Sequence, residues 1–246
     1  MRPQGRCSCY RREARRRTRG MVHARRRLAV FRYRAVMTPS GPVLILGHGA
    51  SGSAATMAPH VAGLRARGID ARAVDLPRGR AERAVPVFAA LLAAGLATDR
   101  PFAVGGQSFG GRVASLAAAD ACDAGRPPLA LTLLSYPLHP PGRPDDWDAR
   151  TAHWPRLTCP VILLCGASDP FATPSFLARA LAERLPAADL VTYPRLGHTL
   201  APVLEDVLDR VAAYVLAVAV RRDREPTWGR EPAGIRTHDA GIKSPT

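Results

Sequence analysis

The stretch PFAVGGQSFGGRVASLAAA, residues 101–119, is the most informative part of the sequence. Its beginning predicts a β-strand and its second half predicts a helix. Between the two, Gly106, Ser108 and Gly110 form the pattern G-x-S-x-G. Glycine on both sides of a serine lets neighbouring backbone approach without a Cβ clash, as a strained turn from strand to helix requires. A merely structural turn is the alternative, but the flanking elements and the further glycine at Gly111 favour a nucleophilic serine.

Outward from this stretch, short apolar runs alternate with helical patterns. The run PVLILG (residues 42–47) is continuously apolar, as expected of a strand buried on both faces of a sheet. Strands that alternate with helices predict right-handed βαβ crossovers, and therefore an α/β fold with a doubly wound, mostly parallel sheet. We expect strands over residues 28–36, 42–47, 69–74, 101–106, 129–135, 161–166 and 190–193, and helices over residues 54–67, 81–97, 109–120, 174–185 and 201–220.

A nucleophilic serine needs a general base that takes its proton and a carboxylate that holds this base in the right tautomer. Where the serine lies in a strand–turn–helix, the chain order is serine, carboxylate, histidine. The strand over residues 161–166 runs directly into Asp169, and His198 lies in RLGHTL, between the last strand and the final helix. We therefore predict Ser108, Asp169 and His198 as a catalytic triad. Asp169 could instead be a turn residue or a cap of the helix that Pro174 opens.

The other histidines fit the role of the base less well. Two lie in the terminal segments, one lies inside a predicted helix, and two flank a proline-rich connection: His23 and His238, His60, and His139 and His153. Order along the chain therefore selects the histidine of RLGHTL.

The oxyanion that forms when a carbonyl is attacked needs two backbone N–H donors. One comes from the residue after the nucleophile, which is Phe109, and the other from a loop that follows an earlier strand. The loop GHGASG (residues 47–52) follows PVLIL directly, so Ala50 is the candidate for the second donor. His48 lies in the same loop. We expect it to brace the loop, with proton transfer as the alternative role.

The net charge of +15 is concentrated at the ends of the chain. Residues 1–34 contain 13 Arg and one acidic residue, whereas residues 35–220 contain 16 Arg and 15 acidic residues. A run of like charges without apolar periodicity is typical of disorder. We therefore expect a basic, disordered tail over residues 1–27, with a nucleic-acid-binding arm or a translation start at Met21 as alternatives. The near-neutral middle of the chain argues against nucleic acid as a partner.

The chain of 246 residues, 47% of them hydrophobic, can form one substantial core. We assign that core to one domain over residues 28–220. The last residues, REPAGIRTHDAGIKSPT, read like a transfer-RNA gene translated on its opposite strand, so we expect residues 221–246 to be a disordered or spurious tail. No apolar run is long enough for a membrane span or a secretory signal, and a cytoplasmic location is expected.

Neither a cofactor nor a metal ion is expected from the sequence. The five cysteines form no repeated C-x-x-C pair, which argues against a zinc site: Cys7, Cys9, Cys122, Cys159 and Cys165. Cys159 and Cys165 border an apolar run and are expected to be buried free thiols.

Four fragments in this order carry a resemblance to a known family: GHGASG, GGQSFGGR, LLSYPLHPPGRP and GASDPF. They resemble the α/β-hydrolase-like family that includes testis-expressed protein 30 and subunit 3 of the NSL histone-acetyltransferase complex, a family related to the dienelactone hydrolases. The match extends over nearly all of residues 46–198. The resemblance implies an α/β-hydrolase fold, Ser108, Asp169 and His198 as the triad, and Ala50 and Phe109 as the oxyanion donors. It implies no particular substrate.

Neighbouring chemistries are disfavoured by the nucleophile itself, because dienelactone hydrolases typically use cysteine and haloalkane dehalogenases use aspartate where this chain has Ser108. Residues 136–160 are too few and too rich in proline for a large helical cap, so we expect a minimal cap and an open site. Four residues of this segment could line the site or could simply pack the loop: Pro137, Leu138, Trp147 and Trp154.

The function that we expect is the hydrolysis of a small ester, thioester or lactone through an acyl-enzyme on Ser108, with a small-molecule acyl substrate as the partner. A non-catalytic binding or scaffold module with the same fold is the alternative, because fold alone does not determine function. A complete triad with its oxyanion loop favours the enzyme, since a scaffold has no physical need of these five residues.

Overall fold

The computed structural model describes residues 41–224. The strand expected over residues 28–36 and the tail expected over residues 1–27 lie outside the described residues, as does the C-terminal segment from residue 225. Among the helices described, none is long and apolar enough to cross a membrane.

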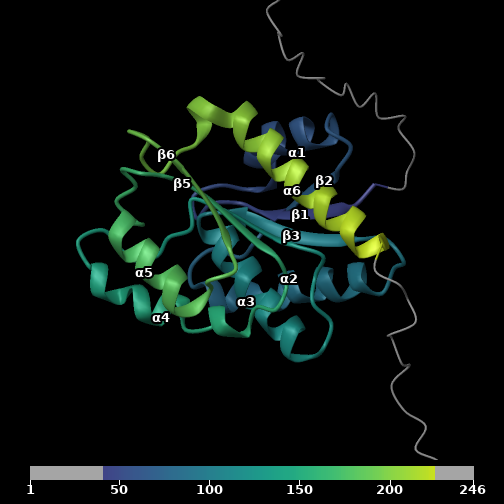
Figure 1. The fold of residues 1–246 in the computed structure, drawn as a ribbon, viewed down its shortest axis with the longest axis horizontal. Coiled ribbons are helices and arrows are strands. Elements are labelled where there is room, and N and C mark those ends of the chain that lie inside the picture. The colour runs from purple at the N-terminus through teal and green to yellow at the C-terminus, as the bar shows by residue number, and fades with distance from the viewer. Residues whose placement is uncertain (1–40, 225–246) are drawn as a thin grey trace, which may run out of the picture. The chain divides into compact units, whose positions relative to one another are not determined.

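The centre of the fold is a sheet of six parallel strands in the order β2-β1-β3-β4-β5-β6 (Figure 1). The strands are β1 (Val43–Gly47), β2 (Asp70–Val74), β3 (Phe102–Gln107), β4 (Leu131–Leu134), β5 (Val161–Gly166) and β6 (Asp189–Tyr193). The predicted α/β fold with a parallel sheet is confirmed.

The strand order reverses between β1 and β3, because β2 adds to one side of β1 and the later strands add to the other. In open α/β sheets, a crevice forms outside the carboxyl ends of the strands at such a reversal. Gly47 at the end of β1 is level with Gly106 near the end of β3. The loop after β1 and the turn after β3 therefore begin side by side at this crevice.

Helices cover both faces of the sheet (Figure 1). One face carries α1 (Ala58–Arg65) and α6 (Leu204–Arg224), and the other carries α2 (Ala81–Leu96), α3 (Phe109–Asp123) and α5 (Pro174–Arg184). This arrangement explains why the inner strands are mostly apolar. In β3, for example, Phe102 and Val104 pack toward α2 and α3, whereas Ala103 between them packs toward α6.

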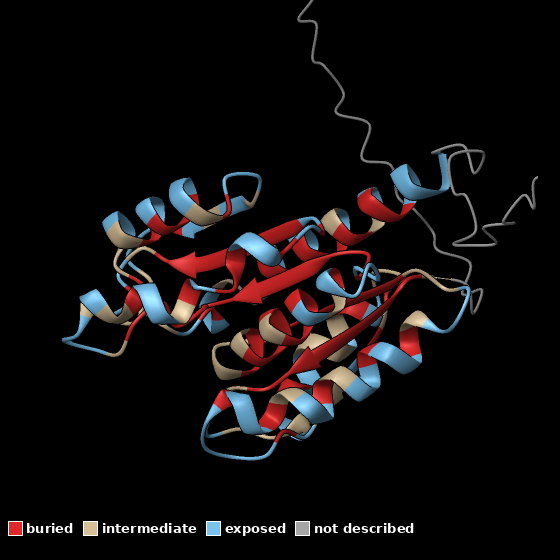
Figure 2. Ribbon diagram, turned by 90° about the horizontal axis from the view of Figure 1, so that it is seen from below, coloured by how far each residue is buried: buried red, intermediate tan, exposed pale blue. Residues whose placement is uncertain are grey.

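Burial is greatest in the inner strands (Figure 2). Every residue of β1, β4 and β5 is buried, whereas the edge strands β2 and β6 are partly exposed. Cys159 and Cys165 are buried free thiols, as predicted.

The helices differ from the sequence prediction chiefly in three places. The helix expected over residues 54–67 begins as a 3-10 helix, η1 (Ala54–Met57), and continues as α1, with Pro59 in its first turn, where a missing N–H costs no hydrogen bond. The last helix continues to Arg224, beyond the expected end at residue 220, and its last turn is rich in arginine, which stabilises the negative end of a helix dipole. Finally, the proline-rich connection over residues 136–160 contains short helical turns that the sequence pattern did not predict, among them α4 (Trp147–Thr151).

Candidate active site

Ser108 lies in the sharp turn between β3 and α3. Its backbone has φ 51° and ψ −115°, a conformation that a non-glycine residue rarely adopts and that costs on the order of 1–3 kcal/mol. The Ser108 N–H donates a hydrogen bond to the Leu134 carbonyl at the end of β4, with 2.8 Å between N and O. The neighbouring strand thus holds the strained turn in place.

The glycines of G-x-S-x-G allow the turn to lie against the end of β1. A Cβ on Gly110 would lie 2.2 Å from the carbonyl carbon of Gly47, and a Cβ on Gly106 would lie 2.7 Å from the Gly47 oxygen. Real Cβ atoms essentially never come so close to backbone. The first turn of α3 and the loop after β1 can therefore be in direct backbone contact only because these positions are glycine.

The structure brings the three predicted triad residues together. His198 Nε2 lies 2.8 Å from Ser108 Oγ, and His198 Nδ1 lies 2.8 Å from Asp169 Oδ2. An ionised carboxylate can only accept, so Nδ1 carries the proton and Nε2 is left to accept the hydrogen bond from the serine hydroxyl. This is the arrangement in which a histidine can remove the proton of a serine.

Asp169 is held where its carboxylate meets the histidine. Its side chain is fully buried, and its Oδ1 accepts a hydrogen bond of 2.8 Å from the Phe171 N–H. The alternative interpretation of Asp169 as a turn residue is therefore also right in part. The loop that carries His198 lies against β5, because a Cβ on Gly166 would lie 2.2 Å from the carbonyl oxygens of Leu196 and Gly197.

The phenyl ring of Phe171 covers the imidazole of His198, with 4.5 Å between the ring centroids and 45° between the planes. Phe171 was not predicted from the sequence, although GASDPF places an aromatic residue two positions after the acid. Packing of this kind restricts the rotation of the imidazole and so keeps it between its two partners.

The two predicted oxyanion donors lie on elements that meet beside Ser108. Phe109 is the first residue of α3, so its N–H has no acceptor within the helix and lies at the positive end of the helix dipole. The Ala50 N–H takes part in none of the hydrogen bonds between described residues. Both groups are therefore free to donate to a substrate oxygen.

His48 braces the loop that contains Ala50, as predicted. It is buried, and its Nε2 accepts a hydrogen bond of 2.9 Å from the Leu76 N–H, so that its proton lies on Nδ1, which donates to the Gly49 carbonyl at 2.7 Å. Both nitrogens are thus used by backbone groups, which leaves no capacity for proton transfer. The carboxylate of Asp75 holds the same region by accepting a hydrogen bond of 2.7 Å from the Ala54 N–H.

The residues of the proline-rich connection pack the core. Leu138 and Trp154 are fully buried, and Trp147 is nearly so, all within the apolar cluster on the α2 and α3 face. Of the two alternatives for this segment, this burial supports loop packing, and none of the four residues is among those that line the cavity described next. The reason is that its short helical turns fold back onto α3 and α5.

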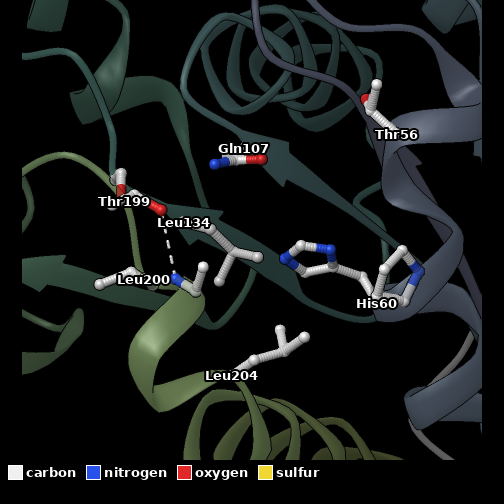
Figure 3. Close-up of a pocket in the computed structure, with 10 residues that line it drawn as sticks. Thr56, His60, Gln107, Leu134, Thr199, Leu200 and Leu204 are labelled. Atoms are coloured by element: carbon white, nitrogen blue, oxygen red, sulfur yellow. Dashed lines mark hydrogen bonds between the residues drawn. The ribbon is translucent and has the colours of Figure 1, made fainter.

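A cavity of about 250 Å³ lies next to the triad, at the carboxyl ends of β3 and β4 (Figure 3). Its walls come from η1 and α1, from the ends of the two strands, and from the segment that leads into α6. It is lined by Thr56, Pro59, His60, Gln107, Leu134, Ser135, Thr199, Leu200, Ala201 and Leu204. Sequence reasoning missed this cavity, because its residues come from distant parts of the chain.

A metal site is not formed by the side chains that the structure describes. Within residues 41–224, no three His, Cys, Asp or Glu side chains are grouped so that they could hold an ion.

Comparison with known proteins defines the class of protein. Residues 40–205 match the family described as alpha/beta hydrolase domain, and the chain belongs to this family. No curated protein matches the sequence.

Solved structures of esterases and lipases have a similar fold. A monoacylglycerol lipase of Paleococcus ferrophilus has a TM-score of 0.61 at 14% identity, covering 73% of this chain and 96% of that one. Est1E of Butyrivibrio proteoclasticus, solved with bound ferulic acid, has a TM-score of 0.60 at 18% identity, covering 75% and 92%. A Pyrobaculum calidifontis esterase has a TM-score of 0.59 at 19% identity, covering 73% and 77%. At these identities the likeness concerns the fold.

Proposed function

We propose that the protein is a serine hydrolase that cleaves a small ester, thioester or lactone through an acyl-enzyme on Ser108. The observation that carries this proposal is the pair of hydrogen bonds of 2.8 Å that join Ser108, His198 and Asp169. Three residues far apart in the sequence meet in the order that acyl transfer needs. A binding module with the same fold would gain nothing from this alignment or from the strained backbone of the serine.

The reaction follows from the positions of these groups. Ser108 Oγ attacks the carbonyl carbon of the substrate while its proton moves to His198 Nε2, and Asp169 stabilises the imidazolium that forms. The oxygen of the tetrahedral intermediate accepts hydrogen bonds from the N–H groups of Phe109 and Ala50. Its collapse expels the alcohol or thiol, which takes the proton from Nε2. Water then attacks the acyl-enzyme by the same steps, and the acid is released.

Two further observations support a small substrate. The proline-rich connection is packed into the core and forms no large cap over the triad, and the cavity beside the triad has a volume of only about 250 Å³. Ferulic acid bound to Est1E is an example of a small ligand on a similar fold. As a further part of this proposal, the chain is related, within the hydrolase family, to testis-expressed protein 30 and subunit 3 of the NSL complex. The four motifs quoted above support this relation.

Labelling with a fluorophosphonate tests the proposal directly, because this probe reacts with an activated serine. We expect one equivalent of probe on Ser108, located by peptide mass spectrometry, and parallel loss of activity on 4-nitrophenyl acetate. Ser108→Ala should take up no probe. Ser168→Ala is the matched control, since Ser168 is an exposed serine next to the acid, and it should be labelled like the parent. A folded parent that is neither labelled nor active would support the scaffold function instead.

A further inference from the structure

The cavity is lined by chain neighbours of the nucleophile and of the base, although not by Ser108 or His198 themselves. Gln107, which lines it, directly precedes Ser108, and Thr199, which also lines it, directly follows His198. A substrate group attached to a carbonyl at Ser108 therefore has this cavity within reach. Its volume of about 250 Å³ offers room for about eight groups of the size of water.

The cavity contains polar side chains whose hydrogen-bonding groups are not used within the protein. His60 and Gln107 both line it, and no side-chain hydrogen bond joins either of them to another described residue. In Figure 3 the imidazole of His60 points into the cavity, and the amide of Gln107 lies above it in this view. Ser135 also lines the cavity, but its Oγ is buried away from accessible space. Unpaired donors and acceptors on the wall of a polar cavity need partners, which a ligand, or water in its place, can supply.

The lining distinguishes between neutral and charged ligands. None of the ten lining residues is Lys, Arg, Asp or Glu. Burial lowers the pKa of His60, so its imidazole is neutral at physiological pH and offers one donor and one acceptor. A carboxylate or phosphate placed here would lose its hydration without gaining an opposite charge. Hydroxyl and carbonyl oxygens match these partners better.

We propose that this cavity is an acyl subsite that selects short acyl groups with a neutral hydroxyl or carbonyl oxygen, bound through His60 and Gln107. This inference rests on the proposed acyl-enzyme at Ser108. The carbon chain of the acyl group packs against the apolar walls, which Leu134, Leu200 and Leu204 provide. The acyl half of the substrate is the one that belongs here, because it stays bonded to Ser108 and the cavity begins at the residue next to that serine.

A pair of esters that differ in one group tests the selectivity. 4-Nitrophenyl 3-hydroxybutanoate and 4-nitrophenyl 3-methylbutanoate have the same leaving group and equal numbers of non-hydrogen atoms, with a hydroxyl in one where the other has a methyl. Both rates are divided by the rates of hydrolysis by hydroxide, which removes the intrinsic difference in reactivity. We expect the parent protein to favour the hydroxy ester by about tenfold or more in kcat/KM, since an apolar analogue leaves the buried polar groups unpaired.

Two variants of one residue connect this selectivity to the cavity. His60→Phe keeps a ring of similar size without hydrogen-bonding groups and should reduce the preference for the hydroxy ester to about twofold or less. His60→Gln introduces an amide that can still donate and accept hydrogen bonds, so it should keep part of the preference. Gln107→Leu should act like His60→Phe. 4-Nitrophenyl 3-methylbutanoate serves as the reference substrate within each variant, so a general loss of activity does not affect the ratio of the two rates.

The outcomes separate this inference from the proposed function. If the parent hydrolyses both esters through Ser108 but without preference, or if its preference survives in His60→Phe and Gln107→Leu, the acyl subsite is wrong and the hydrolase remains. If neither ester is hydrolysed faster by the parent than by Ser108→Ala, the proposed function itself fails.

Discussion

The contact between Gly110 and Gly47 gives a prediction whose size follows from the structure. In Gly110→Ala the new Cβ would lie 2.2 Å from the Gly47 carbonyl carbon and 2.3 Å from its oxygen, whereas ordinary contacts are 3.4–4 Å. The partner is backbone, so α3 and the end of β1 must separate by about 1 Å, and a displacement of that size near reacting atoms costs on the order of 10²-fold in rate. Overpacking of this kind also costs about 1–3 kcal/mol of unfolding free energy.

The assay measures kcat on 4-nitrophenyl acetate together with thermal unfolding. For Gly110→Ala we expect a loss of about 10² to 10³ in kcat, because Phe109 and Ala50 lie on the two segments that move apart. The melting temperature should fall by roughly 2–4 °C for each kcal/mol that is lost. Gly111→Ala is the matched control. It adds the same methyl group one residue further along α3, where the closest contact is 2.9 Å to the Gly106 oxygen. A shift of about 0.5 Å brings this contact to 3.4 Å, which is about half of the separation that Gly110→Ala needs.

The comparison of the two variants decides the outcome. We expect Gly111→Ala to retain kcat within about tenfold of the parent, as its smaller shift implies. Unchanged kcat and melting temperature in Gly110→Ala would refute the reasoning. An equal loss in both variants would attribute the effect to α3 in general and not to its contact with the loop after β1.

The remaining predictions concern the histidines and their partners. Ser108→Ala and His198→Ala should each reduce kcat by about 10⁴-fold or more, and Asp169→Asn by a comparable or somewhat smaller factor. The Ser108 and His198 double variant should lose little beyond either single variant, because the residues act as a unit. Additive losses, in variants shown to be folded by circular dichroism, would contradict this. Burial lowers the pKa of His153 to about 4 from 6.5, so the unfolded chain binds more protons than the folded one between these values, and the free energy of unfolding decreases as the pH is lowered through this range. Lowering the pH from 7 to 5 should therefore cost the parent about 2 kcal/mol of unfolding free energy that His153→Gln does not lose, measured by urea titration, and an equal pH dependence in both would disprove the burial effect. His48→Phe removes two hydrogen bonds that hold the oxyanion loop and should reduce kcat by about 10²-fold without unfolding the protein; unaltered kcat in a folded variant would show that the loop needs no brace.

The candidate site was predictable where its signals are local in the sequence. G-x-S-x-G between a strand and a helix identifies Ser108, because only glycine allows the close approach that the structure shows on both sides of the turn. Asp169 was predictable from a strand that ends just before it, and His198 from its order in the chain. The oxyanion donors followed from their positions relative to the same strands.

The packing around these residues was not predictable in the same way. His60 was recognised only as a residue inside a helix, although its imidazole lies in the cavity beside the triad (Figure 3). The residues of the proline-rich connection could not be assigned to core or site, because Trp147 and Trp154 are compatible with either. Which of the two holds depends on the helices that the connection meets, and these are distant in the sequence.

Periodicity, glycine spacing and the order of elements depend on neighbours along the chain, so the α/β class, the parallel sheet and the residues that meet as a triad follow from the sequence. The strained backbone at Ser108, the bracing partners of His48 and the cavity lined by His60 and Gln107 follow only from the packing of distant elements. A cavity results from how close several elements come to one another. That distance is set by the packing of side chains from all of them.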